Sequence, residues 1–180
     1  SKTISETSSR IKESYRRVQE AARKDNTPYA IDLLLSILEL EPELDEQRKE
    51  LRELQLGQLK KKKPNPMSSV TGMGKLMGVK STIKKTPEKA LPAAEELLKV
   101  DPLNSSFLEA YEDAAKASGY PQAAVILYRE VLKVDKTNAD YWERLGKLYL
   151  ELGQAHQANE AFVELGELKP NDQQVIKWIK

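Results

Sequence analysis

One spacing pattern in the last third of the chain constrains the fold most strongly. It reads W-x2-L-G-x2-Y from Trp142 to Tyr149, followed by Ala158, Phe162 and Pro170. Apolar residues three or four positions apart share one face of a helix, so the pattern predicts two helices that turn back at Gly153. A small residue such as Ala158 would let the two helix backbones approach closely.

The end of an apolar run recurs at intervals of 34 residues. Apolar runs end just before Pro102, Lys136 and Pro170, which are each 34 positions apart, whereas Pro42 and Pro102 are 60 positions apart. We therefore predict four helical repeats and an insertion of 26 residues in the second. The predicted boundaries are an N-terminal tail at 1–10, repeats at 11–44, 45–104 (with a basic insertion at about 60–85), 105–138 and 139–172, and a C-terminal capping helix at 173–180.

Each predicted repeat carries the same apolar stripe in its second helix. Small residues open the helix, and a residue on the same face follows four positions later. Two further apolar residues follow at spacing three. The four positions are Ala30, Leu34, Ile37 and Leu40; Ala90, Ala94, Leu97 and Val100; Ala124, Tyr128, Val131 and Val134; Ala158, Phe162, Leu165 and Leu168.

These residues resemble the tetratricopeptide repeat family, most specifically over 139–172 and in every second helix. The resemblance implies an all-α fold, a right-handed superhelical array of antiparallel helix pairs in about four repeats plus a C-terminal capping helix. It also implies a non-enzymatic scaffold or adaptor that binds other proteins. The first helices depart from the pattern, since Glu112 stands at the usual Gly and Ser14 and Arg17 at usual apolar positions.

In this family the first helices line a concave groove that holds a segment of a partner. Carried over by register, the groove positions are Tyr15, Arg16, Gln19, Lys49, Glu53, Glu109, Asp113, Arg144 and Lys147. Their mixed charge predicts a protein or peptide partner that also carries both signs. Glu50 stands where a related subclass needs a cation for acidic chaperone tails, so that partner is not expected.

The segment 60–85 concentrates positive charge. It holds eight lysines and no acidic residue, although the net charge of the whole chain is only +1. The lysines are Lys60, Lys61, Lys62, Lys63, Lys75, Lys80, Lys84 and Lys85. Three interpretations stay open: a weak helix docked on the array, a mobile loop, or an amphipathic segment that contacts an anionic surface such as a membrane or an acidic protein. Nucleic acid is disfavoured, because no aromatic residue or arginine accompanies the lysines.

Catalysis and cofactors are not expected. The chain has no Cys and one His, His156, with no second ligand at metal-binding spacing. The acidic pairs Glu95–Glu96 and Glu112–Asp113 are interpreted as solvated helix faces rather than acid–base groups.

The ends of the chain complete the sequence-based predictions. Residues 1–25 are polar and no apolar run approaches the ~20 residues of a membrane span, so we expect a cytoplasmic protein that is not integral to a membrane. Four bulky apolar residues crowd the last six positions: Val175, Ile176, Trp178 and Ile179. Either the face formed by Val175, Ile176 and Ile179 seals the last repeat, or Trp178 forms an edge through which the chain becomes a homo-oligomer.

Overall fold

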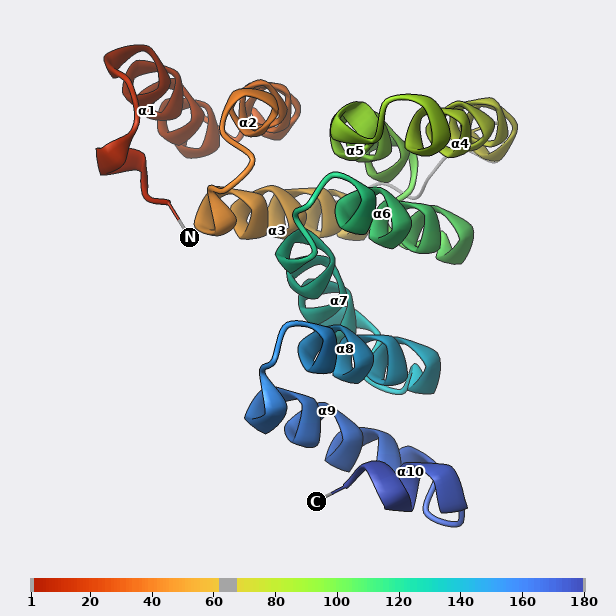
Figure 1. Ribbon diagram of the computed structural model, residues 1–180. Coiled ribbons are helices and arrows are strands. Elements are labelled where there is room, and N and C mark those ends of the chain that lie inside the picture. Colours follow the sequence, from red (N-terminus) through yellow and green to blue (C-terminus); the bar gives the residue numbers. More distant parts are fainter. Residues whose placement is uncertain (1, 62–67, 180) are drawn as a thin grey trace. The chain divides into compact units, whose positions relative to one another are not determined.

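The computed structural model describes residues 2–61 and 68–179, which contain helices joined by turns and no strand (Figure 1). The helices are η1 (Ile4–Glu6), α1 (Ser9–Arg23), α2 (Thr27–Leu40), α3 (Asp45–Lys61), α4 (Ser68–Lys85), η2 (Pro87–Lys89), α5 (Ala90–Val100), α6 (Ser105–Ala117), α7 (Gln122–Val134), α8 (Ala139–Glu151), α9 (Ala155–Leu168) and α10 (Gln173–Trp178). The predicted all-α class is confirmed. The chain forms two compact units, Ser1–Ala123 and Ala124–Lys180.

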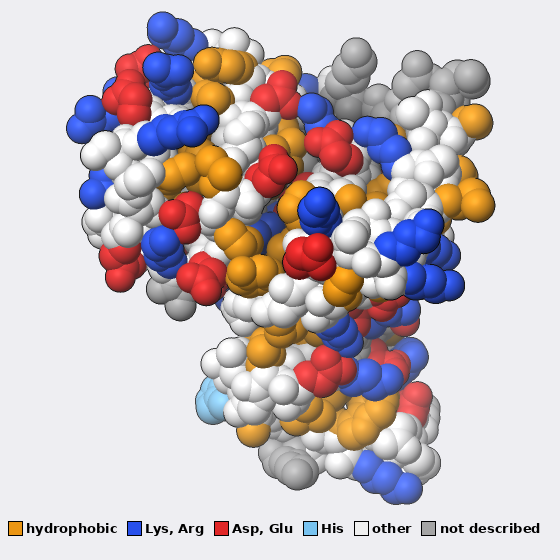
Figure 2. Space-filling model, turned by 45° about the horizontal axis from the view of Figure 1, so that its top comes forward, with side chains coloured by type: hydrophobic (Ala, Val, Ile, Leu, Met, Phe, Trp, Pro, Cys, Tyr) orange, Lys and Arg blue, Asp and Glu red, His pale blue; other side chains and the backbone are white. Residues whose placement is uncertain are grey.

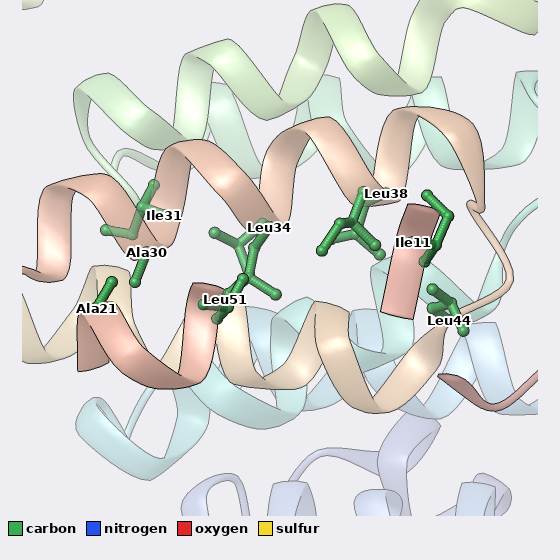
Figure 3. Close-up of a cluster of buried hydrophobic side chains, with 10 residues drawn as sticks. Ile11, Ala21, Ala30, Ile31, Leu34, Leu38, Leu44 and Leu51 are labelled. Atoms are coloured by element: carbon green, nitrogen blue, oxygen red, sulfur yellow. The ribbon is translucent and has the colours of Figure 1, made fainter. Parts of the chain in front are cut away.

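The first core of the N-terminal unit lies between α1, α2 and α3. Figure 3 shows buried aliphatic side chains from the three helices pointing toward one another. Ala30 and Leu34 of α2 are fully buried there, and Leu51 of α3 closes the cluster. The predicted N-terminal tail is ordered where it is described: Ile4 packs on this core and the Lys2 ammonium lies 2.7 Å from a Glu41 carboxylate oxygen.

The second core of this unit is built by α4, α5 and α6. Helix α4 packs on both α5 and α6, and its inward face carries Gly72, Leu76 and Val79. A Cβ added at Gly72 would overlap the ring of Phe107 in α6, so the missing side chain sets how closely these two helices approach. The helix that forms a hairpin with α5 is thus α4, whereas α3 packs on α2.

The packing of α4 tests the three interpretations of the lysine-rich segment 60–85 over its described residues. Residues 68–85 form a helix of 18 residues docked on its neighbours, so the mobile loop is wrong there. Its three glycines lower the helix propensity of this segment, but burial of Leu76 and Val79 stabilises the helix. Lys62 and Lys63 lie outside the described residues. The repeat boundaries themselves stay a prediction.

The C-terminal unit contains most of α7, a hairpin of α8 and α9, and the short helix α10. α8 and α9 pack together, and Gly153 adopts a φ of +70° in the turn between them, where an L-residue would be strained. A Cβ at Gly146 would overlap the Phe162 ring, so this glycine allows the same close approach as Gly72 does. Asp172 accepts hydrogen bonds from the backbone N–H groups of residues 174 and 175 and caps α10.

The apolar stripe of the second helices is confirmed at three positions and wrong at the fourth. The four alanines and the residues four positions later are all buried, as are Ile37, Leu97, Val131 and Leu165. Leu40, by contrast, is 61% exposed. At about 100° per residue it lies roughly 80° around the helix from Ala30, on the last residue of α2, and so leaves the buried face. Val134 and Leu168, which also end their helices, are exposed as well.

The two contrasting glycines of α4 give a matched test of its packing. Gly72→Ala should lower the free energy of unfolding by about 1–2 kcal/mol, because crowding the Phe107 ring outweighs the gain in helix propensity. Gly78→Ala, where a Cβ meets nothing within 4 Å, should instead stabilise the protein by up to about 1 kcal/mol. Urea unfolding followed by circular dichroism measures both; equal effects would contradict this packing.

Candidate protein-interaction site

The N-terminal unit brings two sets of the predicted groove residues together. The Tyr15 hydroxyl of α1 donates a hydrogen bond of 2.9 Å to a Glu50 carboxylate oxygen of α3. Burial raises the pKa of Tyr15, the bond to Glu50 raises it further, and Gln47 and Gln19 oppose the rise. Tyr15 and Gln19 therefore lie beside the segment of α3 that carries the predicted groove residues Lys49 and Glu53.

Burial also affects Glu50 itself. It raises the pKa of the Glu50 carboxyl, the hydrogen bond from Tyr15 opposes the rise, and the neighbouring charge of Glu53 adds to it. Arg16 points away from this pair, is exposed, and lies 3.5 Å from Glu13 on its own helix. The α1–α3 surface is thus a half-buried polar patch with an acidic centre.

The remaining groove residues lie on α6 and α8. Glu109 and Asp113 are exposed on α6, in the N-terminal unit. In the C-terminal unit, Arg144 lies 3.0 Å from Asp140 and Lys147 lies 2.5 Å from Glu143, both at i,i+4 spacing. Such exposed pairs contribute about 0.3–0.5 kcal/mol each, so a partner could replace them at little cost. Figure 2 shows one face of the molecule, on which acidic and basic side chains are interspersed with hydrophobic ones.

A buried ionic network that the sequence analysis missed holds α3 in place. Arg48 and Arg52 are 1% and 0% exposed, and both bind the Glu95 carboxylate of α5. The Tyr111 hydroxyl of α6 accepts from both guanidinium groups, at 3.1 and 3.0 Å, and donates 2.7 Å to Glu95. The Arg52 guanidinium also lies 4.9 Å from the centre of the Tyr111 ring. Three helices therefore meet at one carboxylate.

The interpretation of Glu95–Glu96 as a solvated pair is wrong for Glu95, which is 5% exposed. Burial opposes its ionisation, but the charges of Arg52 and Arg48 outweigh that effect and hold its pKa below the usual range. Glu112 is likewise buried, and its carboxylate lies 3.0 Å from the Lys116 ammonium. The spacing of Arg48, Leu51 and Arg52 on one helical face was the signal that could have revealed the network.

A pocket of about 400 Å³ opens beside this network, between α2 and α5. Arg48 and Glu95 contribute to its wall, together with the apolar side chains of Leu35 and Leu91. Five carboxylates and two cations line it: Asp32, Glu39, Glu88, Glu95 and Glu96, with Arg48 and Lys99. The excess of carboxylates disfavours an anionic ligand.

The lysines of 60–85 divide into two groups. Lys61 lies 3.1 Å from Asp25, and Lys75 lies 3.3 Å from Glu96, both in exposed ion pairs. Lys60 is exposed at the end of α3. Lys80, Lys84 and Lys85 are exposed on α4, and none of them forms an ion pair within the described residues. Among the described lysines of this segment, those without an ion pair are therefore Lys60, at the end of α3, and these three in the C-terminal part of α4.

Trp178 is half-buried against the core of the C-terminal unit. Its ring stacks on Phe162 with 5.1 Å between centroids, and the Lys147 ammonium lies 5.2 Å above it. Val175 of the same helix is buried, whereas Ile176 is 48% exposed. These contacts agree with a sealing role for α10, although Ile176 is not on the sealed face as predicted. Self-association through Trp178 stays a prediction.

The chemistry of the described residues offers few other sites. His156 is exposed and lies 3.5 Å from Glu160. No group of three His, Cys or acidic side chains that could hold a metal ion occurs among the described residues. No helix in that part of the chain is long and apolar enough to span a membrane.

The decisive comparison concerns residues 127–159, which match the model of the tetratricopeptide repeat family. The chain contains a tetratricopeptide repeat. The match confirms the resemblance, and it covers five of the residues that carried it: Trp142, Leu145, Gly146, Tyr149 and Ala158. Tetratricopeptide repeats generally serve as protein-interaction scaffolds and are typically not enzymes. No curated protein matches the chain.

Several solved structures show a distant likeness. MamA 41-end from Desulfovibrio magneticus RS-1 is 17% identical, with a TM-score of 0.47 over 92% of this chain and 98% of its own. A thermophilic tetratricopeptide repeat protein of Thermus thermophilus is 16% identical, with a TM-score of 0.42 over 93% and 96% of the two chains. A MamA protein is 15% identical, with a TM-score of 0.43 over 94% and 78%. These values are too low to inform the binding properties of this chain.

The ionic network yields a prediction with a built-in control. Glu95→Gln should lower the free energy of unfolding at pH 7 by about 3–5 kcal/mol, because two guanidinium groups lose their buried partner. Glu96→Gln, which touches only the exposed Lys75 pair, should change it by less than about 1 kcal/mol.

The pH dependence follows from the depressed pKa of Glu95. A carboxyl with a folded-state pKa below its unfolded value stabilises the fold above the ordinary value of 4.5 and loses that contribution as pH falls through the folded pKa. The stability gap between the parent and Glu95→Gln should therefore persist from pH 7 to pH 4.5 and shrink only below it. Urea unfolding at a series of pH values measures the gap; a gap that closes above pH 5 would contradict the depressed pKa.

Proposed function

We propose that the chain is a non-enzymatic interaction module that holds a segment of a partner protein on the exposed faces of its first helices, the predicted concave groove. The observation that carries the proposal is the match of residues 127–159 to the tetratricopeptide repeat model, a range that includes α8. On α8, Arg144 and Lys147 form ion pairs within the helix that a partner could exchange. Tyr15, Gln19, Lys49 and Glu53 form the corresponding surface of the N-terminal unit. Both signs of charge on each surface favour a partner segment of mixed charge.

A double charge reversal on α8 tests this proposal. Arg144→Glu with Lys147→Glu should abolish capture of the partner from an extract of the native cell, because acidic residues of the partner would then meet carboxylates instead of a guanidinium and an ammonium group. Lys136→Glu with Lys169→Glu makes the same change of net charge in the same unit but off this surface, and should retain the partner. Quantitative mass spectrometry of the captured proteins compares the variants. Equal recovery by both, with unchanged circular dichroism, would exclude the α8 surface.

The alternative function is that of a peripheral adaptor whose lysine-rich segment contacts an anionic surface. It is favoured by Lys80, Lys84 and Lys85, which are exposed without ion pairs in the described part of the chain. Removing 60–85 would be a poor test, because Leu76 and Val79 belong to the core of the N-terminal unit. Lysine substitution on α4 with vesicle sedimentation is the cleaner measurement.

A further inference from the structure

Helix α4 has two faces of different character. The face with Gly72, Leu76 and Val79 packs on α5 and α6. On the other side, Val70, Met73 and Met77 are 68%, 56% and 72% exposed. We call these three residues the Met face. The spacing of three and four residues places them in one stripe along the helix, so the helix presents a continuous apolar strip to solvent.

Glycines, which have no side chains, lie next to the apolar strip. Gly74 and Gly78 lie beside the methionines, and a Cβ added to either would meet nothing within 4 Å. The surface next to the Met face is therefore flat, and a second backbone could approach it closely, as small residues allow at helix contacts. Methionine side chains adapt their shape to an apolar partner. This combination suits a packed helix better than a single extended strand.

Charge continues the strip along the helix axis. Lys80 and Lys84 follow the Met face at the same helical spacing, both exposed, and neither forms an ion pair within the described residues. Helix α4 contains no acidic residue. The strip is therefore apolar in its N-terminal half and basic in its C-terminal half. A complementary segment needs apolar residues at one end and carboxylates at the other.

We propose that the Met face, with Lys80 and Lys84, is a docking site for an amphipathic helix of a partner protein that is acidic at one end. The proposal rests on the proposed function as an interaction module, and adds a second surface and the chemistry of its occupant. A partner helix that runs antiparallel to α4 would place its N-terminal turn beside the lysines. The helix dipole favours acidic residues in that turn. The same acidic residues would therefore stabilise the partner helix and bind the lysines of α4.

A lipid bilayer fits the same strip less well. Interfacial helices insert a broad apolar face that usually includes Trp, Phe or Leu, with lysines along the polar side. The Met face has three side chains, none of them aromatic, and its lysines extend the strip at one end. Along the axis of α4 an apolar half is followed by a basic half. This order fits a partner helix that binds in one direction, with its acidic end beside the lysines.

Selection from a displayed library of helical peptides of about 18 residues, roughly five turns, tests the proposal directly. With the full chain as bait, enriched peptides should carry apolar residues at i, i+3 or i+4, and i+7, and acidic residues in the first turn. Met73→Ser with Met77→Ser should weaken binding of a selected peptide about tenfold or more. Leu40→Ser with Val134→Ser removes two apolar side chains of comparable exposure elsewhere and should leave the affinity unchanged.

A charge exchange separates electrostatic recognition from general stickiness. Lys80→Glu with Lys84→Glu should weaken the selected peptide, and replacing the peptide's first-turn acids by lysine should restore binding to this variant but not to the parent. Lys12→Glu with Lys24→Glu, exposed positions of the same unit, is the control for net charge. Peptides that bind every variant like the parent, or a selection without acidic amphipathic sequences, would overturn the proposal.

Two further measurements decide between occupants. Sedimentation with phosphatidylserine vesicles that depends on Met73, Met77 and Lys84, in the absence of peptide binding, would show a membrane surface instead. Light scattering that detects a dimer lost on Met73→Ser with Met77→Ser would show a second copy instead. Either result overturns the peptide proposal. Peptides lost only by Arg144→Glu with Lys147→Glu would leave the proposed function standing and remove this inference. Peptides lost only by the α4 variants would support this inference, and the capture experiment on α8 would then decide the proposed function separately.

Discussion

The N-terminal unit depends on two arginines buried around one carboxylate. Arg48 and Arg52 come from α3, Glu95 from α5 and Tyr111 from α6, so a single network joins helices that are distant in sequence. Two cations share one anion, and the Nε atoms of both arginines are buried without a hydrogen-bond partner. Such a network adds little net stability compared with an apolar contact, but its geometry tolerates few alternatives. It therefore restricts how α3 is oriented, and with it the polar surface that α3 shares with Tyr15.

The parts of the fold that sequence predicted are those governed by helical periodicity. Ala30 and its counterparts in the other second helices are buried because a small residue is needed wherever two helix axes approach closely. The failures lie at helix ends, where Leu40 has rotated away from the face that the stripe defines. Periodicity alone could not reveal this, because it marks a face but not the residue at which packing stops.

The sequence pattern alone could not show that α4 is the helix that pairs with α5, because this pairing depends on tertiary contacts. Three glycines made residues 68–85 a poor candidate for an isolated helix, at a cost of about 1 kcal/mol each. Tertiary packing reverses that preference, since Leu76 and Val79 are buried and Gly72 accepts the ring of Phe107. The lysines were visible in the sequence, whereas the Met face was not, because its exposure follows only from which side of α4 is covered. For the same reason the partners of Arg48 could not be assigned before α5 and α6 were placed.

Rigid and exchangeable interactions are thus separated within the molecule. Charges in the interior are fixed by partners from other helices, and removing one of them leaves a buried ion unpaired. Arg144 and Lys147 on the predicted binding surface are paired within one helix, with Asp140 and Glu143, and water or a partner can replace such a pair at small cost. The Met face has no such pairing to exchange, so a partner there would gain mainly by covering apolar surface. The buried ion pairs can therefore fix the packing of the helices, while the ion pairs on the surface can be exchanged for contacts with a partner.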